Sequence, residues 1–357
     1  YQKAVEIEPD FADAHYNLAN ALSQLGDLKQ AIESYKASLA INPSDIEVLL
    51  DYGNTLKNYG KFDQAIEVYI QALTIDPSSV SAQTNMDNAF EEKLEIEKLV
   101  CDYAKVTELD IGSGEIISFT GTILKARGYL DAAIDSYKKA LMIKSDYAEA
   151  YYNMGVALQG KGELDAAIDS YKQALKIKPE YAQAYYNLGN ILKGKAELDA
   201  AIDSYNEALR IKPDFAEAYY NIGVTLQDKA ELDAAIDSYK QALKIKPDYA
   251  EAYNNMGNAL QDKAQLDAAV DSYKQALKIK PDYAEAYNNM GNVLKGKAEL
   301  DAAIDSYKQS IKIKPDYAEA YNNMGNALHD KAQLDAAIDS YKQALKIKPD
   351  YAEAYNN

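Results

Sequence analysis

The sequence predicts an all-α array of helix hairpins, and two regularities carry this prediction. Proline recurs every 34 residues, at Pro9, Pro43, Pro77, Pro179, Pro213, Pro247, Pro281, Pro315 and Pro349 once the two skipped positions, Ile111 and Ser145, are counted. Between these positions apolar residues recur at intervals of three and four in two separate runs, which is the pattern of two amphipathic helices. No long stretch alternates apolar and polar residues, so strands are not expected.

The unit at 250–283 shows the expected elements in order. Asp248 precedes the first helix and Glu251 follows three residues later, a pattern close to a capping box. The apolar face of the first helix is then formed by Tyr253, Met256, Gly257 and Leu260. A turn comes next, and the second helix has an apolar face of Leu266, Ala269, Val270, Tyr273, Ala276 and Leu277. Pro281 ends the unit because proline cannot continue a helix.

The turn between the two helices needs a residue in the left-handed conformation, which glycine adopts without strain. The early units place glycine there, at Gly26, Gly60, Gly128 and Gly162. The later units place alanine there, at Ala196, Ala230, Ala264, Ala298 and Ala332. Alanine at positive φ is strained, so we expect these turns either to adjust or to carry a modest cost.

The series Tyr253, Met256, Gly257, Leu260, Ala269, Tyr273 and Pro281 resembles the signature of the tetratricopeptide repeat family, and it recurs along essentially the whole chain. The resemblance implies a right-handed α-solenoid superhelix of 34-residue helix-turn-helix repeats. In that frame residues 1–11 are the end of a second helix and 12–79 form two repeats. Residues 80–113 form a degenerate repeat, 114–351 form seven repeats, and 352–357 begin a further one. Since the chain starts and stops inside repeats, we expect it to be a piece of a longer protein.

The repeat at 80–113 departs from the pattern at three positions. Asp87 lies where the small residue is expected, Leu99 replaces the second-helix alanine, and Leu94 takes the place of the turn residue. Residues 91–106 could therefore run as one longer helix. Two interpretations stay open: neutral drift, and a joint or docking point in the array.

Composition argues for a protein-binding role and against several others. The net charge is −18, and residues 1–113 alone carry 20 acidic against 8 basic residues, so a nucleic-acid partner is not expected. No apolar run is long enough for a membrane span. A single cysteine, Cys101, and two distant histidines, His15 and His329, offer neither a metal site nor a catalytic group. We therefore expect no cofactor, no metal, no enzymatic activity and a cytoplasmic location.

The family resemblance implies that the first helices line a concave groove. The expected peptide-binding residues are mainly asparagines in two columns three residues apart, joined by tyrosines of a third column. They are Asn17, Asn20, Asn153, Asn187, Asn190, Asn221, Asn255, Asn258, Asn289, Asn292, Asn323, Asn326, Tyr152, Tyr186 and Tyr220. The arrangement resembles the asparagine ladder of the O-linked N-acetylglucosamine transferase superhelix. The alternative is that these asparagines bond within and between hairpins and set the curvature.

The expected function is a non-catalytic scaffold that holds an extended polypeptide segment in this groove. An asparagine offers both a donor and an acceptor, so it could grip a peptide backbone. The columns lack Lys and Arg and the rim carries Glu, which favours a basic or neutral segment over capture of a peptide C-terminus. Two alternatives remain: the substrate-recruiting region of a larger peptide glycosyltransferase- or sulfotransferase-like enzyme, and a repeat protein that self-associates through its uncapped ends.

Overall fold

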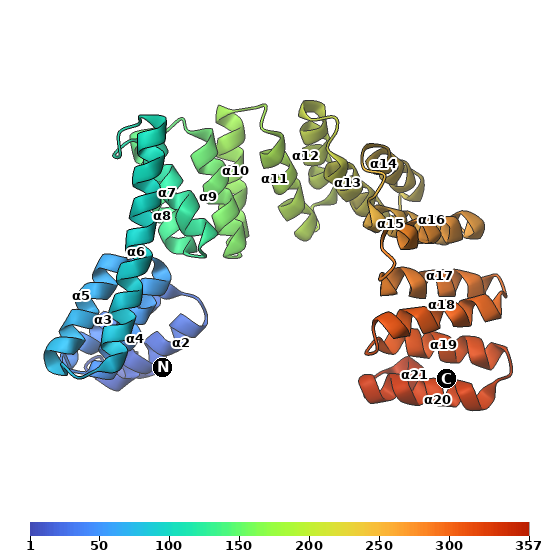
Figure 1. The fold of residues 1–357 in the computed structure, drawn as a ribbon, viewed down its shortest axis with the longest axis horizontal. Coiled ribbons are helices and arrows are strands. Elements are labelled where there is room, and N and C mark those ends of the chain that lie inside the picture. Colours follow the sequence, from blue (N-terminus) through green and yellow to red (C-terminus); the bar gives the residue numbers. More distant parts are fainter. Residues whose placement is uncertain (357) are drawn as a thin grey trace. The chain divides into compact units, whose positions relative to one another are not determined.

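The computed structural model describes residues 1–356, and within that range it contains helices and no strand (Figure 1). This confirms the predicted all-α array. The hairpins are α2 (Ala12–Gln24) with α3 (Leu28–Ile41), α4 (Ile46–Tyr59) with α5 (Phe62–Ile75), α7 (Gly114–Ala126) with α8 (Leu130–Ile143), α9 (Ala148–Gly160) with α10 (Leu164–Ile177), α11 (Ala182–Gly194) with α12 (Leu198–Ile211), α13 (Ala216–Asp228) with α14 (Leu232–Ile245), α15 (Ala250–Asp262) with α16 (Leu266–Ile279), α17 (Ala284–Gly296) with α18 (Leu300–Ile313), and α19 (Ala318–Asp330) with α20 (Leu334–Ile347). No helix in the described range is long and apolar enough to cross a membrane.

Two compact units make up the chain, Tyr1–Pro179 and Glu180–Asn357. The short helices α1 (Gln2–Ile7) and α21 (Ala352–Asn356) lie at the two ends of the sequence. Inside each unit a helix packs against its hairpin partner and against the nearest helix of the next hairpin. Each hairpin therefore depends mainly on its immediate neighbours, as expected for a repeat array.

A tyrosine packed against a glycine closes each regular hairpin except the first, where Ala19 takes the position of the glycine. Tyr273 of α16 is fully buried, and a Cβ atom added at Gly257 of α15 would lie only 2.6 Å from its Cε1 atom. Ala269, one turn before Tyr273, is also fully buried. The two helices approach this closely because the column opposite the ring has no side chain. The same contact recurs between Gly223 and Tyr239.

The turns between helices adopt the expected left-handed conformation. Gly60 has φ of 91°, and the alanines that replace glycine in the later units keep positive φ, 56° at Ala264 and 62° at Ala196. The turns therefore do not adjust their backbone to accommodate alanine. Each of these alanines retains a conformation that disfavours a side chain.

The predicted capping pattern at Asp248 and Glu251 is wrong. The residue before α15 is Tyr249, and no side chain accepts a hydrogen bond from the first turn. Side-chain caps occur elsewhere, for example at α4, where Asp45 accepts from the Val48 backbone N–H at 3.3 Å. Glu251 instead faces Lys280, with 3.6 Å between its Oε1 and the lysine Nζ. The recurring glutamate is therefore part of an ion pair with the end of the second helix.

Within residues 80–113 one long helix stands where the other repeats form a hairpin. Helix α6 (Val80–Thr107) spans 28 residues without a break (Figure 1). Its first part packs on α5 and its second part on α7. Leu94, at the position of the turn, lies inside this helix. The expectation of a single longer helix is confirmed.

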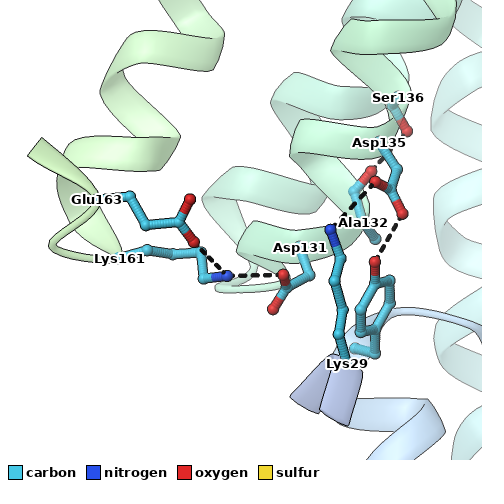
Figure 2. A network of polar contacts seen from close by, with 8 residues as sticks. Lys29, Asp131, Ala132, Asp135, Ser136, Lys161 and Glu163 are labelled. Carbon is cyan, nitrogen blue, oxygen red and sulfur yellow. Dashed lines mark hydrogen bonds and ion pairs between the residues drawn. The ribbon is translucent and has the colours of Figure 1, made fainter. Parts of the chain in front are cut away.

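The straight course of α6 is accompanied by direct contacts between α4 and α8 within residues 1–179. The Tyr59 hydroxyl donates to Asp135 Oδ2 at 2.7 Å, and Lys29 Nζ lies 3.9 Å from the other oxygen of that carboxylate (Figure 2). Burial, with the neighbouring Asp135 carboxylate, raises the pKa of Tyr59 above its usual range. The rings of Phe62 and Tyr129 meet edge to face at 5.1 Å. Both polar and aromatic contacts therefore support this junction.

Candidate functional site

The first helices of the hairpins line the inner side of the row in residues 180–356. Helices α11, α13, α15, α17 and α19 contact one another in sequence, whereas neighbouring second helices in the described range are not in comparable contact. A row of hairpins whose first helices lie closer together is curved toward those helices. The face they form is called the inner face below.

The first asparagine column on this face consists of Asn187, Asn221, Asn255, Asn289 and Asn323. Its side chains donate hydrogen bonds to the preceding hairpin. Asn221 Nδ2 donates to Asn190 Oδ1 at 2.8 Å and to the Tyr186 hydroxyl at 3.1 Å. Asn289 Nδ2 repeats this pattern with Asn258 at 3.2 Å and Asn254 at 3.3 Å.

Two further members of the first column, Asn255 and Asn323, donate in the same direction. Asn255 Nδ2 donates to the Tyr220 hydroxyl at 2.9 Å, and Asn323 Nδ2 donates to Asn288 Oδ1 at 3.1 Å. Asn187 accepts from Gln183 of its own helix at 3.2 Å. The column therefore links neighbouring hairpins, as the structural alternative in the sequence analysis expected.

The second asparagine column consists of Asn190, Asn258, Asn292 and Asn326, with Val224 in the one remaining position. Each asparagine accepts a hydrogen bond from the buried tyrosine of its own hairpin, at 2.9 Å from Tyr205 to Asn190 and 2.7 Å from Tyr273 to Asn258. Tyr307 and Tyr341 bond Asn292 and Asn326 in the same way, each at 2.8 Å. The carbonyl oxygens of this column therefore point toward the core.

At four of these asparagines the two columns present opposite polarity to a molecule on the inner face, whereas the Oδ1 atoms of Asn187 and Asn255 already accept from Gln183 and Asn254. In the first column the amide nitrogens of Asn221 and Asn289 are bonded to the preceding hairpin, so their Oδ1 atoms are the remaining groups, and these accept. In the second column the oxygens of Asn190 and Asn258 are occupied, which leaves their NH₂ groups, and these donate. All four side chains are half-buried.

The third column changes from tyrosine to asparagine along the second unit. Tyr186 and Tyr220 are half-buried, and their rings pack on Phe215 and Tyr249 at 4.7 and 4.9 Å. Burial raises the pKa of Tyr220 above its usual range. The next three members of the third column, Asn254, Asn288 and Asn322, are buried. From Asn254 onward this column therefore takes part in the packing between hairpins, where Asn254 and Asn288 accept from Asn289 and Asn323.

In residues 1–179 the same columns are interrupted. Asn20 and Asn54 still accept from the hairpin tyrosines Tyr35 and Tyr69. Asn17 donates only to the Asp13 carbonyl of its own helix at 2.8 Å, and Asn153 accepts from Lys125 at 3.1 Å.

Two positions of the first column in this unit hold other residues. Asp51 accepts from the Tyr16 hydroxyl at 2.8 Å, and Phe119 stacks on Tyr103 with 3.7 Å between ring centres. Tyr152, the third-column residue here, packs on Tyr171 at 5.9 Å. An uninterrupted first column is therefore a feature of the second unit.

The glutamate rim expected to attract basic ligands is largely paired. Glu149, Glu217, Glu251 and Glu285 each lie within 2.9 to 3.9 Å of a lysine at the end of the second helix. The same lysine also lies over an aromatic ring, as with Lys280 and Tyr283 at 4.6 Å. Sequence reasoning missed this pair, although the lysine recurs 29 residues after the glutamate in each of these units.

A second set of ion pairs joins the hairpin turns to the preceding second helix. Lys297 Nζ lies 2.8 Å from Asp267 and 2.6 Å from Glu299. In residues 1–179 the equivalent group is Asp131, Lys161 and Glu163 (Figure 2). The Lys297 ammonium lowers the pKa of the Asp267 carboxyl. These pairs tie neighbouring hairpins together at their turns.

The two histidines and the cysteine, considered above as metal ligands or catalytic groups, have separate surroundings. His15 Nε2 lies 2.8 Å from the Pro9 carbonyl oxygen, and His329 is exposed near Asp330. Cys101 is a free thiol on α6. Among the described residues no group of three or more His, Cys, Asp or Glu side chains is placed to hold a metal ion.

Comparison with known proteins gives a consistent result for the fold. Tetratricopeptide repeat models match residues 12–45 and 46–79, and a TPR repeat model matches 121–162, 160–195, 189–230, 228–264, 262–298, 297–332 and 325–357. The matched ranges pass over residues 80–120, where α6 replaces the hairpin. No match was found among curated proteins.

Among solved structures, the C-terminal part of a TPR repeat-containing protein from Cytophaga hutchinsonii is 17% identical, with a TM-score of 0.56 over 66% of this chain and 97% of that one. The MamA protein is 31% identical, with a TM-score of 0.44 over 46% of this chain and 97% of that one. YrrB, described as a TPR protein with an unusual peptide-binding site, is 25% identical, with a TM-score of 0.46 over 53% and 97%. The repeated signature, the hairpin geometry and the matched family models place this chain in the tetratricopeptide repeat family.

Proposed function

We propose that the chain is a non-catalytic scaffold that binds an extended polypeptide segment along the inner face of residues 180–356. The observation that carries the proposal is the opposite polarity of the two asparagine columns. An extended peptide backbone presents both N–H and C=O groups along its edge. The acceptors of Asn221 and Asn289, beside the donors of Asn190 and Asn258, can satisfy both kinds of group without reading the side chains. The proposed ligand is therefore recognised mainly through its backbone.

Charge sets the preferred composition of this segment. The chain carries a net charge of −18, so a basic or neutral peptide approaches it more favourably than an acidic one. Because several rim glutamates are paired with lysines, this preference acts through the overall field more than through free rim carboxylates. We expect it to weaken as salt concentration rises.

The test must separate binding from the structural role of the asparagines. Random peptides displayed on phage are first selected on the intact chain, and their affinity is measured by fluorescence anisotropy. We expect the combined change of Asn221, Asn255 and Asn289 to Ala to lower the affinity at least about tenfold, since several backbone hydrogen bonds are lost. Circular dichroism checks that helical content is kept.

The matched control is the pair Tyr205→Phe and Tyr273→Phe. These changes remove the buried hydroxyls that donate to Asn190 and Asn258 but leave every predicted binding residue in place. If the tyrosine variants weaken binding as much as the alanine variant, the asparagines act only by positioning the hairpins. Unchanged affinity in the folded alanine variant would show that the asparagine columns are not the binding site.

A further inference from the structure

Helix α6 exposes positions that the regular hairpins bury or, at Leu22, half-bury. Phe90 is 50% exposed, whereas Leu260, at the same position of the repeat, is 7% exposed. Val106 is 83% exposed, and its counterpart Ala276 is fully buried. These positions are covered by the partner helix in a hairpin. Since α6 does not fold back on itself, its own chain leaves them open.

The side chains of α6 explain why the hairpin stays open. Asp87 and Tyr103 occupy the positions of Gly257 and Tyr273, which touch in a closed hairpin. A Cβ atom at Gly257 would already lie 2.6 Å from the tyrosine ring, so a whole aspartate cannot be accommodated there. The same chain therefore cannot cover the first half of α6 in the usual way.

One apolar stripe runs along this uncovered side. Phe90, Leu94 and Cys101 follow one another at spacings of four and seven residues, which places them on one side of the helix. Leu94 is 47% exposed. We call these three residues the open stripe. It is long enough to receive a second helix.

Charges of opposite sign flank the two halves of the open stripe. Glu91 lies beside its first half and Lys98 beside its second half, three residues before and four residues after Leu94. Both side chains are exposed, and neither forms an ion pair within residues 1–356. At 1.5 Å per residue both lie roughly 5 Å along the helix from Leu94.

We propose that a second copy of this chain covers the open stripe, with its α6 antiparallel to the first. A two-fold axis near Leu94 then sets Glu91 of each copy against Lys98 of the other, which forms two ion pairs by symmetry. A parallel arrangement would oppose like charges instead. The complementarity lies between the two halves of one helix, which is why a second copy fits better than an unrelated helix. This dimer is independent of the proposed peptide binding.

Analytical ultracentrifugation of the whole chain tests the proposal. The stripe is short, so the contact is smaller than a standard interface, and the mass should be followed from about 1 μM to about 1 mM. We expect the average mass to rise from that of the 39.5 kDa chain toward twice that value. Leu94→Glu should abolish the rise, whereas Met142→Glu, at an 86% exposed residue of α8, should not.

Exchange of the charges at Glu91 and Lys98 tests whether a second copy of the chain covers the open stripe. Glu91→Lys and Lys98→Glu each place like charges across the axis, so each variant alone should dimerise at least about tenfold more weakly. An equal mixture of the two variants should recover the original affinity, because each chain then meets the opposite charge twice. No recovery on mixing would overturn the antiparallel pairing. A constant mass of one chain, or a dimer indifferent to Leu94→Glu, would overturn the site altogether.

Discussion

Residues 80–113 and 250–283 occupy equivalent spans of the repeat, yet the first is a single helix and the second a closed hairpin. Both carry the tyrosine that closes hairpins, at Tyr103 and Tyr273. Tyr273 is fully buried, whereas Tyr103 is 37% exposed and stacks on Phe119 of α7. The tyrosine alone therefore does not form a hairpin. The residue that faces it decides whether the two helices can meet.

Three positions separate the two spans. The column opposite the tyrosine holds Gly257 in the hairpin and Asp87 in α6. The other two changes are Leu99 in place of the buried alanine and Leu94 at the turn, where the regular units adopt positive φ. Hairpin formation in this array thus requires small residues at the contact and a turn residue able to leave the helix.

The largest expected effect is the conversion of α6 into a hairpin. The combined change Asp87→Gly, Leu94→Gly and Leu99→Ala supplies all three missing features. Spin labels at positions 81 and 105, whose hairpin counterparts Glu251 and Gln275 are not buried, with Cys101→Ser to remove the native thiol, should then move from about 36 Å apart, the length of 24 helical residues, to about 20 Å. Pulsed electron paramagnetic resonance measures this distance.

The same labels without the three changes provide the reference and should keep the long distance. If the long distance persists in the triple variant as well, contacts of α6 with α5 and α7 hold the helix straight, and the three columns do not explain the difference.

A smaller effect is expected from the reverse experiment in a regular hairpin. Gly257→Asp forces a carboxylate against the buried Tyr273 ring, and we expect it to lower the free energy of unfolding of this hairpin by about 3 kcal/mol or more. Hydrogen exchange of the α15 and α16 amides measures the local loss. Gln275→Asp, which adds the same charge at an exposed position of α16, should change it little.

Ala269→Leu isolates the steric part of this contact. It should cost about 1–3 kcal/mol, because it overpacks a fully buried position without adding charge. Equal exchange rates in the aspartate variant, this leucine variant and the parent chain would show that the hairpin tolerates bulk at this contact.

The smallest expected effect concerns pH. Burial raises the pKa of Tyr137 and of Tyr283 to about 12. An unfolded tyrosine has a pKa near 10. Between these values the unfolded chain binds fewer protons than the folded one, so stability present below about pH 10 falls as pH rises, by up to about 1.4 kcal/mol per pH unit for each such tyrosine.

Urea unfolding followed by circular dichroism from pH 9 to pH 12 measures this slope. Tyr137→Phe removes one titrating group and should make the decline shallower. An identical slope in this variant would mean that the ring of Tyr137 does not contribute to alkaline unfolding.

The sequence was sufficient to predict the repeats, the hairpins and the single helix at 80–113, because each depends on residues close together in the chain. The 34-residue interval located the turns, and their glycines and alanines indicated the left-handed backbone. The asparagine columns were also visible as columns. The sequence did not show which end of each amide faces outward. That orientation depends on tyrosines of the same hairpin and on asparagines of the previous one.

Two other expectations failed for related reasons. The Asp248–Glu251 pattern suggested a helix cap, but the glutamate instead lies near a lysine of the second helix. The rim glutamates were expected to attract basic ligands, and several of them are paired with lysines. Short-range patterns therefore identified the elements, while contacts between elements decided the roles of individual polar side chains. Use of the columns in peptide binding stays a prediction.

The alanine turns have a consequence for how such a chain can grow. All five lie in the second unit, at Ala196, Ala230, Ala264, Ala298 and Ala332, while the turns of the first unit use glycine. A left-handed alanine costs about 1 kcal/mol. Each added copy of a hairpin with an alanine turn therefore adds one strained turn as well as its favourable contacts. The total cost of the turns in free energy increases with the number of copies.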